Sequence, residues 1–341
     1  MSLSTRRKSL PYDLGSERLR AAVAIVAVGS IVPSVQAQIS ADQVNQIRNA
    51  NQARVEALTI WGSDYGFSDG IFNTRGGLQS PSAEVHSELV KLGGSGEIGD
   101  PQPMAGAPIG WQPRLQGNMG YLASESNLQP EPLKGDRTRV TTYGIEFGGG
   151  VRFWMSPAFS VAPTLMGIYG STSEDYTDRS AFAQTHLAQL VGLGLIDWHV
   201  DTWTLRPALN LQYLILVDRT IITLSTDSTY FHTESFSSSH AKFHVDGDSE
   251  TVAATVDVDV PLGIQAQGHE LRTGGFISYT VLGGDLREGL NVQGMNEIHG
   301  RLVFDALNQV WKLQWIGIGV SYIVGHNITG WTVDADFAFR F

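Results

Sequence analysis

The chain has 341 residues, of which 42% are hydrophobic and 17% charged, with no cysteine and a formal net charge of −11. The absence of cysteine excludes a disulfide framework and thiolate metal sites, and it fits a protein exported to an oxidising compartment. The acidic balance argues against nucleic acid as a partner, because a phosphate-binding surface needs clustered Lys and Arg.

The first 37 residues have the layout of a secretory signal. Basic residues, among them Arg6, Arg7 and Lys8, precede the apolar stretch from Ala21 to Val35, and Val35 and Ala37 place short side chains at the −3 and −1 positions of a cleavage site. This apolar stretch is too short to span a bilayer as a helix. We therefore predict a signal peptide over residues 1–37, cleaved between Ala37 and Gln38.

Residues 38–60 are predicted to form a polar helix. Ser40 suits a helix start, and apolar residues recur through Gln, Asn and Arg from Ala41 to Ile60. The stretch from Gly93 to Pro113 is rich in Gly and Pro, so it is predicted to be loop and not a separate domain. Residues 61–341 are therefore assigned to one unit.

Apolar and polar residues alternate over much of that unit. Between Thr142 and Met155 the odd positions are mostly apolar, while the even positions include Thr142, Glu146 and Arg152. A period of two is typical of a strand with one apolar and one polar face. The same pattern predicts strands at Phe159 to Tyr169, Trp203 to Val217, Val252 to Val260 and Thr329 to Phe341, and more weakly at Trp111 to Leu122, Leu187 to His199, Glu270 to Leu282, Glu297 to Asp305 and Trp311 to Val324. A hairpin between Val55 and Leu92 brings the total to about 12 strands, with 10 possible without it.

The connections differ in length in a regular way. Short links are predicted at Ser156-Pro157, Asp201-Thr202 and Ala306 to Gln309, and long polar ones at Gly170 to Thr185, Asp218 to Glu250 and Gly283 to Asn296. Outer-membrane barrels have short periplasmic turns and long external loops. The fold class that follows is all-β, a transmembrane antiparallel up-and-down β-barrel. Its strand from Thr142 to Met155 runs inward, and its last strand ends in the periplasm.

The last strand carries an aromatic face to the final residue. Trp331, Val333, Ala335, Phe337, Phe339 and Phe341 lie on one face, and Asp334 and Asp336 lie on the other. This closely resembles the C-terminal signature of outer-membrane proteins, a terminal Phe preceded by apolar residues at every second position. The resemblance implies that Phe337, Phe339 and Phe341 are an assembly signal read by the barrel-assembly machinery. It also implies a place in the outer membrane, in contact with its lipid.

A polar helix followed by a barrel of roughly 280 residues resembles the translocator unit of autotransporters, in which a helix occupies the lumen of a twelve-stranded barrel. In that family the barrel carries a passenger. Only about 20 residues separate the expected cleavage site from the barrel-like region, which leaves no room for one. The resemblance therefore implies a solitary autotransporter-like barrel, with the N-terminal helix in its lumen and a structural or translocation-type role.

Candidate chemistry is sparse. His232, His240 and His244 lie together, but no HExxH motif accompanies them, so no metal ligand and no cofactor is assigned. No GxSxG elbow is present, which argues against an enzyme. The glycines between Gly144 and Gly150 lack the Lys of a phosphate loop, and inward-facing Gly is expected to make room for a plug or a strand bend.

Charged residues on the polar faces are expected to point into the lumen. Glu146, Arg152, Asp334 and Asp336 would there hydrogen-bond an internal helix or tune a pore. The alternative to a plugged barrel is a passive cation-selective pore, also lined by Asp257 and Asp259. A different class of alternative is a surface hydrolase, or an adhesin working through the loop from Asp218 to Glu250. The substrate is unknown from the sequence.

Overall fold

The computed structural model describes residues 55–58, 61, 66–75, 84–104, 110–127, 136–177, 196–240, 244–266, 269–305 and 313–339, with isolated positions between 181 and 191. The expected signal peptide, its cleavage site at Ala37 and Gln38, most of the expected helix and the terminal Phe341 lie outside these residues.

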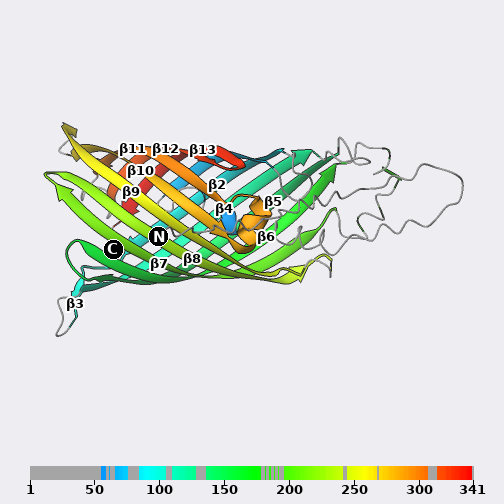
Figure 1. The fold of residues 1–341 in the computed structure, drawn as a ribbon, viewed down its shortest axis with the longest axis horizontal. Helices are drawn as coiled ribbons and strands as arrows, with labels where there is room; N and C mark the ends of the chain where they lie inside the picture. The colour runs from blue at the N-terminus through cyan, green and yellow to red at the C-terminus, as the bar shows by residue number, and fades with distance from the viewer. Residues whose placement is uncertain are drawn as a thin grey trace, which may run out of the picture. The chain divides into compact units, whose positions relative to one another are not determined.

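Twelve antiparallel strands follow one another around a closed wall (Figure 1). They are β1 (Gly66–Arg75), β2 (Glu84–Glu97), β4 (Gly110–Asn127), β5 (Arg137–Trp154), β6 (Phe159–Thr177), β7 (His199–Val217), β8 (Thr220–Ser238), β9 (Asp246–Ala266), β10 (His269–Gly283), β11 (Gly294–Asp305), β12 (Leu313–Gly325) and β13 (Ile328–Phe339). The circuit closes where β1 pairs with β13 and where β2 pairs with β4. The short β3 (Gln102–Pro103) pairs with the first residues of β4 and lies outside the circuit. The predicted antiparallel barrel of about 12 strands is confirmed.

The two-residue period sorts the side chains of each strand between the interior and the outer surface. On β5, Thr142 and Glu146 are buried, whereas Tyr143, Ile145 and Phe147 are exposed, Phe147 by 68%. A continuous apolar outer face would cause aggregation in water, and it is what a surface in contact with lipid requires.

Two belts of aromatic side chains border this apolar face. Tyr121, Tyr143, Tyr169 and Trp203 form the first belt on β4 to β7, and Trp111, Phe153, Phe159 and Tyr213 form the second. On each of the four strands the two aromatic residues are 10 positions apart. At about 3.3 Å per residue and a tilt of about 40°, this spacing gives an apolar band about 25 Å tall, the height found in outer-membrane barrels.

Two predictions about the connections are wrong. The long outer loop predicted from Asp218 to Glu250 is instead a tight turn at Asp218 and Arg219, the strand β8 and the start of β9. The alternation was missed because outward positions of β8, such as Thr226 and Ser228, are polar. The adhesin hypothesis therefore loses the loop on which it depended.

The strand predicted from Leu187 to His199, with a turn at Asp201 and Thr202, is also wrong. Described positions 188 and 191 are helical, and Asp201 and Thr202 lie inside β7. The apolar residues of this stretch follow one another without a clear period of two, so they did not distinguish strand from helix. One predicted strand is absent and β8 is added, so the total of 12 strands is kept. The strand from Trp203 to Val217, however, runs opposite to the direction that a turn at Asp201 and Thr202 implied.

Helices contribute little to the described residues. Residues 55–58 are helical, and α3 (Gly284–Leu290) lies between β10 and β11. Within the described part of the chain, no helix combines the length and the apolar character needed to cross a membrane.

Candidate functional site in the barrel interior

Three glycines form a row across the inner wall of the barrel. Gly120, Gly144 and Gly170 are register partners on β4, β5 and β6. A Cβ atom would lie 3.1 Å from the Leu58 side chain at Gly120, 2.8 Å from it at Gly144, and 2.6 Å from the Val55 side chain at Gly170. Side chains at this glycine row would therefore occupy the space that residues 55–58 fill.

Residues 55–58 and Trp61, here called the lumen segment, are buried inside the barrel. Glu56 accepts a hydrogen bond of 3.0 Å from the Thr233 hydroxyl on β8. Lys91 on β2 donates one of 3.2 Å to the Trp61 carbonyl, and the Trp61 ring stacks on Phe72 of β1 with centroids 4.6 Å apart. Together with the glycine row, these contacts attach the lumen segment to several strands of the wall.

An apolar cluster joins the lumen segment to the end of the barrel that carries the connection with α3, here called the outer end. This outer cluster consists of Ala57, Leu58, Trp61, Phe72, Leu89, Leu122, Leu282, Leu286, Val292, Met295, Ile323 and Ile328, all at most 4% exposed. Its members come from the lumen segment, from the wall and from the connection that contains α3. The outer part of the interior is thus packed like the core of a soluble domain.

Glu146 is buried beside the lumen segment. It accepts a hydrogen bond of 2.7 Å from the Asn118 amide and pairs with Arg206 of β7. The Arg206 guanidinium lies 5.7 Å from the centre of the Phe231 ring. The carboxylate and the guanidinium therefore share one enclosed site, where each compensates the other's lost hydration.

Arg152, near the C-terminal end of β5, is also buried. It lies 2.7 Å from Glu97 of β2 and donates hydrogen bonds to Gln212 of β7 and, at 3.5 Å, to Ser160 of β6. The Arg152 side chain thus joins β2 on one side of β5 to β6 and β7 on the other side, so its role is to hold the strands together.

Asp334 and Asp336 lie on the buried face of β13. Asp334 accepts a hydrogen bond of 3.1 Å from Thr332, and its carboxylate is 3.7 Å from His299 Nδ1. On the same strand Phe337 is half-buried, whereas the side chain of Phe339 and all of Phe341 lie outside the description.

The contacts of His299 test the hydrolase hypothesis directly. Ser321 Oγ lies 2.9 Å from His299 Nδ1, the same nitrogen that Asp334 approaches. A catalytic triad needs the serine and the carboxylate on opposite ring nitrogens. At Gly319 a Cβ atom would lie 2.7 Å from His299 Nε2, so the backbone of β12 closes the other side of the ring. This arrangement does not match a triad.

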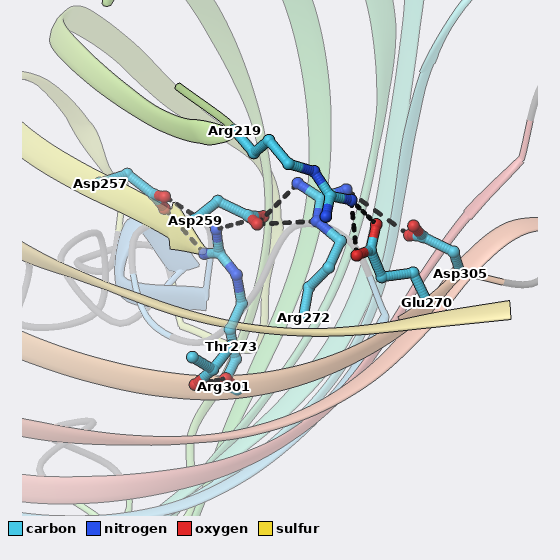
Figure 2. A network of polar contacts seen from close by, with 8 residues as sticks. All are labelled: Arg219, Asp257, Asp259, Glu270, Arg272, Thr273, Arg301 and Asp305. Atoms are coloured by element: carbon cyan, nitrogen blue, oxygen red, sulfur yellow. Dashed lines mark hydrogen bonds and ion pairs between the residues drawn. The ribbon is translucent and has the colours of Figure 1, made fainter. Parts of the chain in front are cut away.

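A second set of charged side chains lies on β9, β10 and β11 and on the turn between β7 and β8 (Figure 2). This charged ladder consists of Arg219, Asp257, Asp259, Glu270, Arg272, Arg301 and Asp305. Arg301 binds Asp257 through two contacts of 2.7 and 2.8 Å, Arg272 lies 2.7 Å from Asp259 and 3.5 Å from Asp305, and Arg219 contacts Glu270 at 2.6 Å. The sequence indicated the two aspartates on β9, but pairing them with arginines requires the strand register.

The loop histidines do not converge. His232 points outward from β8 and lies 3.0 Å from Asp248, while His244 lies 3.1 Å from the Ser235 hydroxyl. Among the residues that the structure describes, no group of three or more His, Asp or Glu is arranged to hold a metal ion.

Comparisons with known proteins agree with this architecture. The family described as "Solitary outer membrane autotransporter beta-barrel domain" matches residues 105–337. The solved beta domain of the Bordetella autotransporter Brka is similar at 12% identity and a TM-score of 0.50, covering 82% of this chain and 100% of that one. The transport unit of autotransporter AIDA-I from Escherichia coli has 9% identity, a TM-score of 0.51, and coverage of 86% and 99%.

The translocator domain of autotransporter NalP from Neisseria meningitidis is also similar, at 10% identity and a TM-score of 0.50, with coverage of 89% of this chain and 100% of that one. No curated protein sequence matches the chain. At these identities the similarity to solved structures establishes the fold alone.

Proposed function

We propose that this chain, which belongs to the family of solitary outer-membrane autotransporter β-barrel domains, is a plugged barrel with a structural or translocation-type role in the outer membrane. Its own lumen segment occupies the outer part of the interior, so the barrel does not act as an open pore. In this proposal no passenger is carried and no reaction is catalysed.

The fit between the glycine row and the lumen segment is the observation that carries the proposal. Val55 and Leu58 occupy the space above Gly144 and Gly170, where any side chain would collide with them. A wall that only had to enclose water would have no need of three aligned glycines, because glycine weakens a strand. The row therefore supports an interior shaped for a permanent occupant.

Planar-bilayer recording tests the proposal. The parent barrel should give no steady current. Gly144→Val should raise the conductance, because the valine side chain would displace Leu58 from its packing position against β5. Gly300→Val is the matched control. Gly300 also lies in a strand, but among the described residues no atom beyond its own chain neighbours lies within 4 Å of its Cβ position. A steady current through the parent barrel would contradict the plug.

A passive pore remains the second candidate function, and the charged ladder favours it. Asp257 and Asp259 are only partly buried, and the ladder holds four carboxylates against three arginines. An open barrel would therefore present a small excess of negative charge that attracts cations. Cation-selective current from the parent barrel would support this alternative, and conductance only after displacement of the lumen segment would support the plug.

The division of the chain into a signal peptide at residues 1–37, a helix at 38–60 and a barrel at 61–341 is part of the proposal. Mass spectrometry of the protein extracted from outer membranes should find Gln38 as the first residue.

Recognition of the last strand by the barrel-assembly machinery through Phe337, Phe339 and Phe341 is also part of the proposal. Replacement of Phe341 by Ala should reduce the amount of heat-modifiable protein in the outer membrane.

A further inference from the structure

The connection between β10 and β11 is attached to the barrel on two sides. On one side it contacts β9: the Leu286 backbone N–H donates a hydrogen bond of 2.9 Å to Ser249 Oγ, and Asp285 accepts one of 3.1 Å from the Asp248 backbone. Gly284 has a φ of +61°, and a Cβ atom there would lie 2.2 Å from the Asp248 carbonyl oxygen. This close approach requires glycine.

On the other side the connection contacts β1 and the turn before β13. The Asn291 amide donates a hydrogen bond of 3.1 Å to the Arg75 carbonyl, and the Asn327 amide donates one of 3.2 Å to the Asn291 carbonyl. Asn291 ends α3 in the left-handed region, with φ 55°. In the strand order β1 and β9 are far apart, so the connection bridges separate parts of the rim.

Between these attachments the connection buries apolar side chains. Leu286 and Val292 are 0% exposed, and both belong to the outer cluster that contains Ala57 and Leu58 of the lumen segment. The polar side chains of Arg287 and Glu288 on the same helix remain exposed. The helix therefore presents one face to the lumen segment and the other to the outside.

We infer that residues 284–293 are an external lid, held closed by these contacts, that covers the outer mouth above the lumen segment. The lid and the lumen segment share one dry cluster, so the segment cannot be reached from outside until the lid has opened. This inference rests on the plugged barrel proposed above, and it adds an order of events: the lid opens first, and the lumen segment becomes accessible second.

Cysteine labelling on intact cells tests the lid, because the native chain has no cysteine. The reporter is Ala57→Cys in the full chain, treated with a maleimide whose polymer tail is too long for general porins. It should not be labelled in the parent background. Leu286→Asp should raise its labelling rate about tenfold or more, since an uncompensated carboxylate is not tolerated in a dry cluster.

Two controls and a second lid variant keep the result interpretable. Arg287→Asp changes an exposed residue of the same helix and should leave Ala57→Cys unlabelled, while Gln293→Cys, which is exposed, should be labelled in the parent. If Leu286→Asp does not assemble, as judged by heat-modifiable gel mobility, Gly284→Val opens the lid by collision with Asp248 instead.

Labelling of Ala57→Cys in the parent, or no labelling in any assembled lid variant while Gln293→Cys reacts, would overturn the lid. Failure of the proposed function has a different signature, which is steady current through the parent barrel. The two measurements are independent, so either result can fail alone.

Discussion

The two ends of the barrel interior are built in different ways. Toward the outside, the lumen segment, the wall and the lid bury a single apolar cluster, and the charged groups beside it, such as Glu146, are enclosed and paired. Toward the periplasm, the charged ladder lies on a wall that is only partly covered. The difference shows that one closed sheet can hold an apolar core at one end and a charged, partly exposed lining at the other. We expect the stability of the plugged state to be concentrated in the dry end.

The largest effect is expected from breaking the enclosed ion pair. Glu146→Ala leaves Arg206 buried without its carboxylate and should cost about 3–5 kcal/mol in the free energy of unfolding. Urea unfolding of the barrel in lipid vesicles, followed by tryptophan fluorescence, measures this cost. The double variant Glu146→Gln with Arg206→Met should recover part of it, and a loss below about 1 kcal/mol for Glu146→Ala would mean that water reaches the site.

A cavity in the outer cluster should cost nearly as much. Leu89 is 0% exposed, and Leu89→Ala should lower stability by about 2–5 kcal/mol in the same unfolding assay. Leu92→Ala on the same strand is the comparison, because Leu92 is 43% exposed on the outer face. Equal losses for the two variants would contradict a closely packed interior.

The pair of buried aspartates on β13 should give an intermediate effect. Replacement of both Asp334 and Asp336 by Ala removes the carboxylate beside His299. It should lower the temperature at which the folded gel band is lost. The matched control is Thr329→Ala, at an exposed position of the same strand. An unchanged transition temperature would remove these carboxylates from the list of stabilising groups.

The smallest effect is expected in the charged ladder. Arg219 is 67% exposed, so Arg219→Ala should change stability by only about 0.2–1 kcal/mol. This contribution should disappear at about 1 M salt, where the Debye length falls to about 3 Å, while the effect of Glu146→Ala should persist. Salt-independent behaviour of Arg219→Ala would indicate that the periplasmic end is as enclosed as the outer end.

The fold was largely predictable from the sequence because a barrel needs only alternation, and alternation is a local signal. The alternation is strongest where the outward side chains are apolar, as on β5 with Ile145 and Phe147. It failed on β8, where outward residues such as Ser228 are polar, and it misread residues 187–199, where apolar residues do not alternate.

The interior was less predictable, since it depends on which strands are neighbours. Gly144 was expected to make room for a plug, but its alignment with Gly120 and Gly170 exists only once the strand register is known. Likewise Asp257 was recognised as an acid on a polar face, while its partner Arg301 lies on β11, 44 residues further along the chain. Contacts across the lumen, such as Thr233 with Glu56 at a separation of 177 residues, leave no trace in a local pattern.

The aromatic belts have a consequence for where this protein can reside. Their 10-residue spacing on four neighbouring strands sets the height of the apolar band at about 25 Å. Each ångström of difference between this height and the thickness of the surrounding hydrocarbon carries a modest cost in free energy. A membrane with a thicker core would have to thin around the protein or pull the belts away from the headgroups. The chain should therefore insert most readily into bilayers of short-chain lipids, and thickness alone would disfavour its insertion into thicker bilayers.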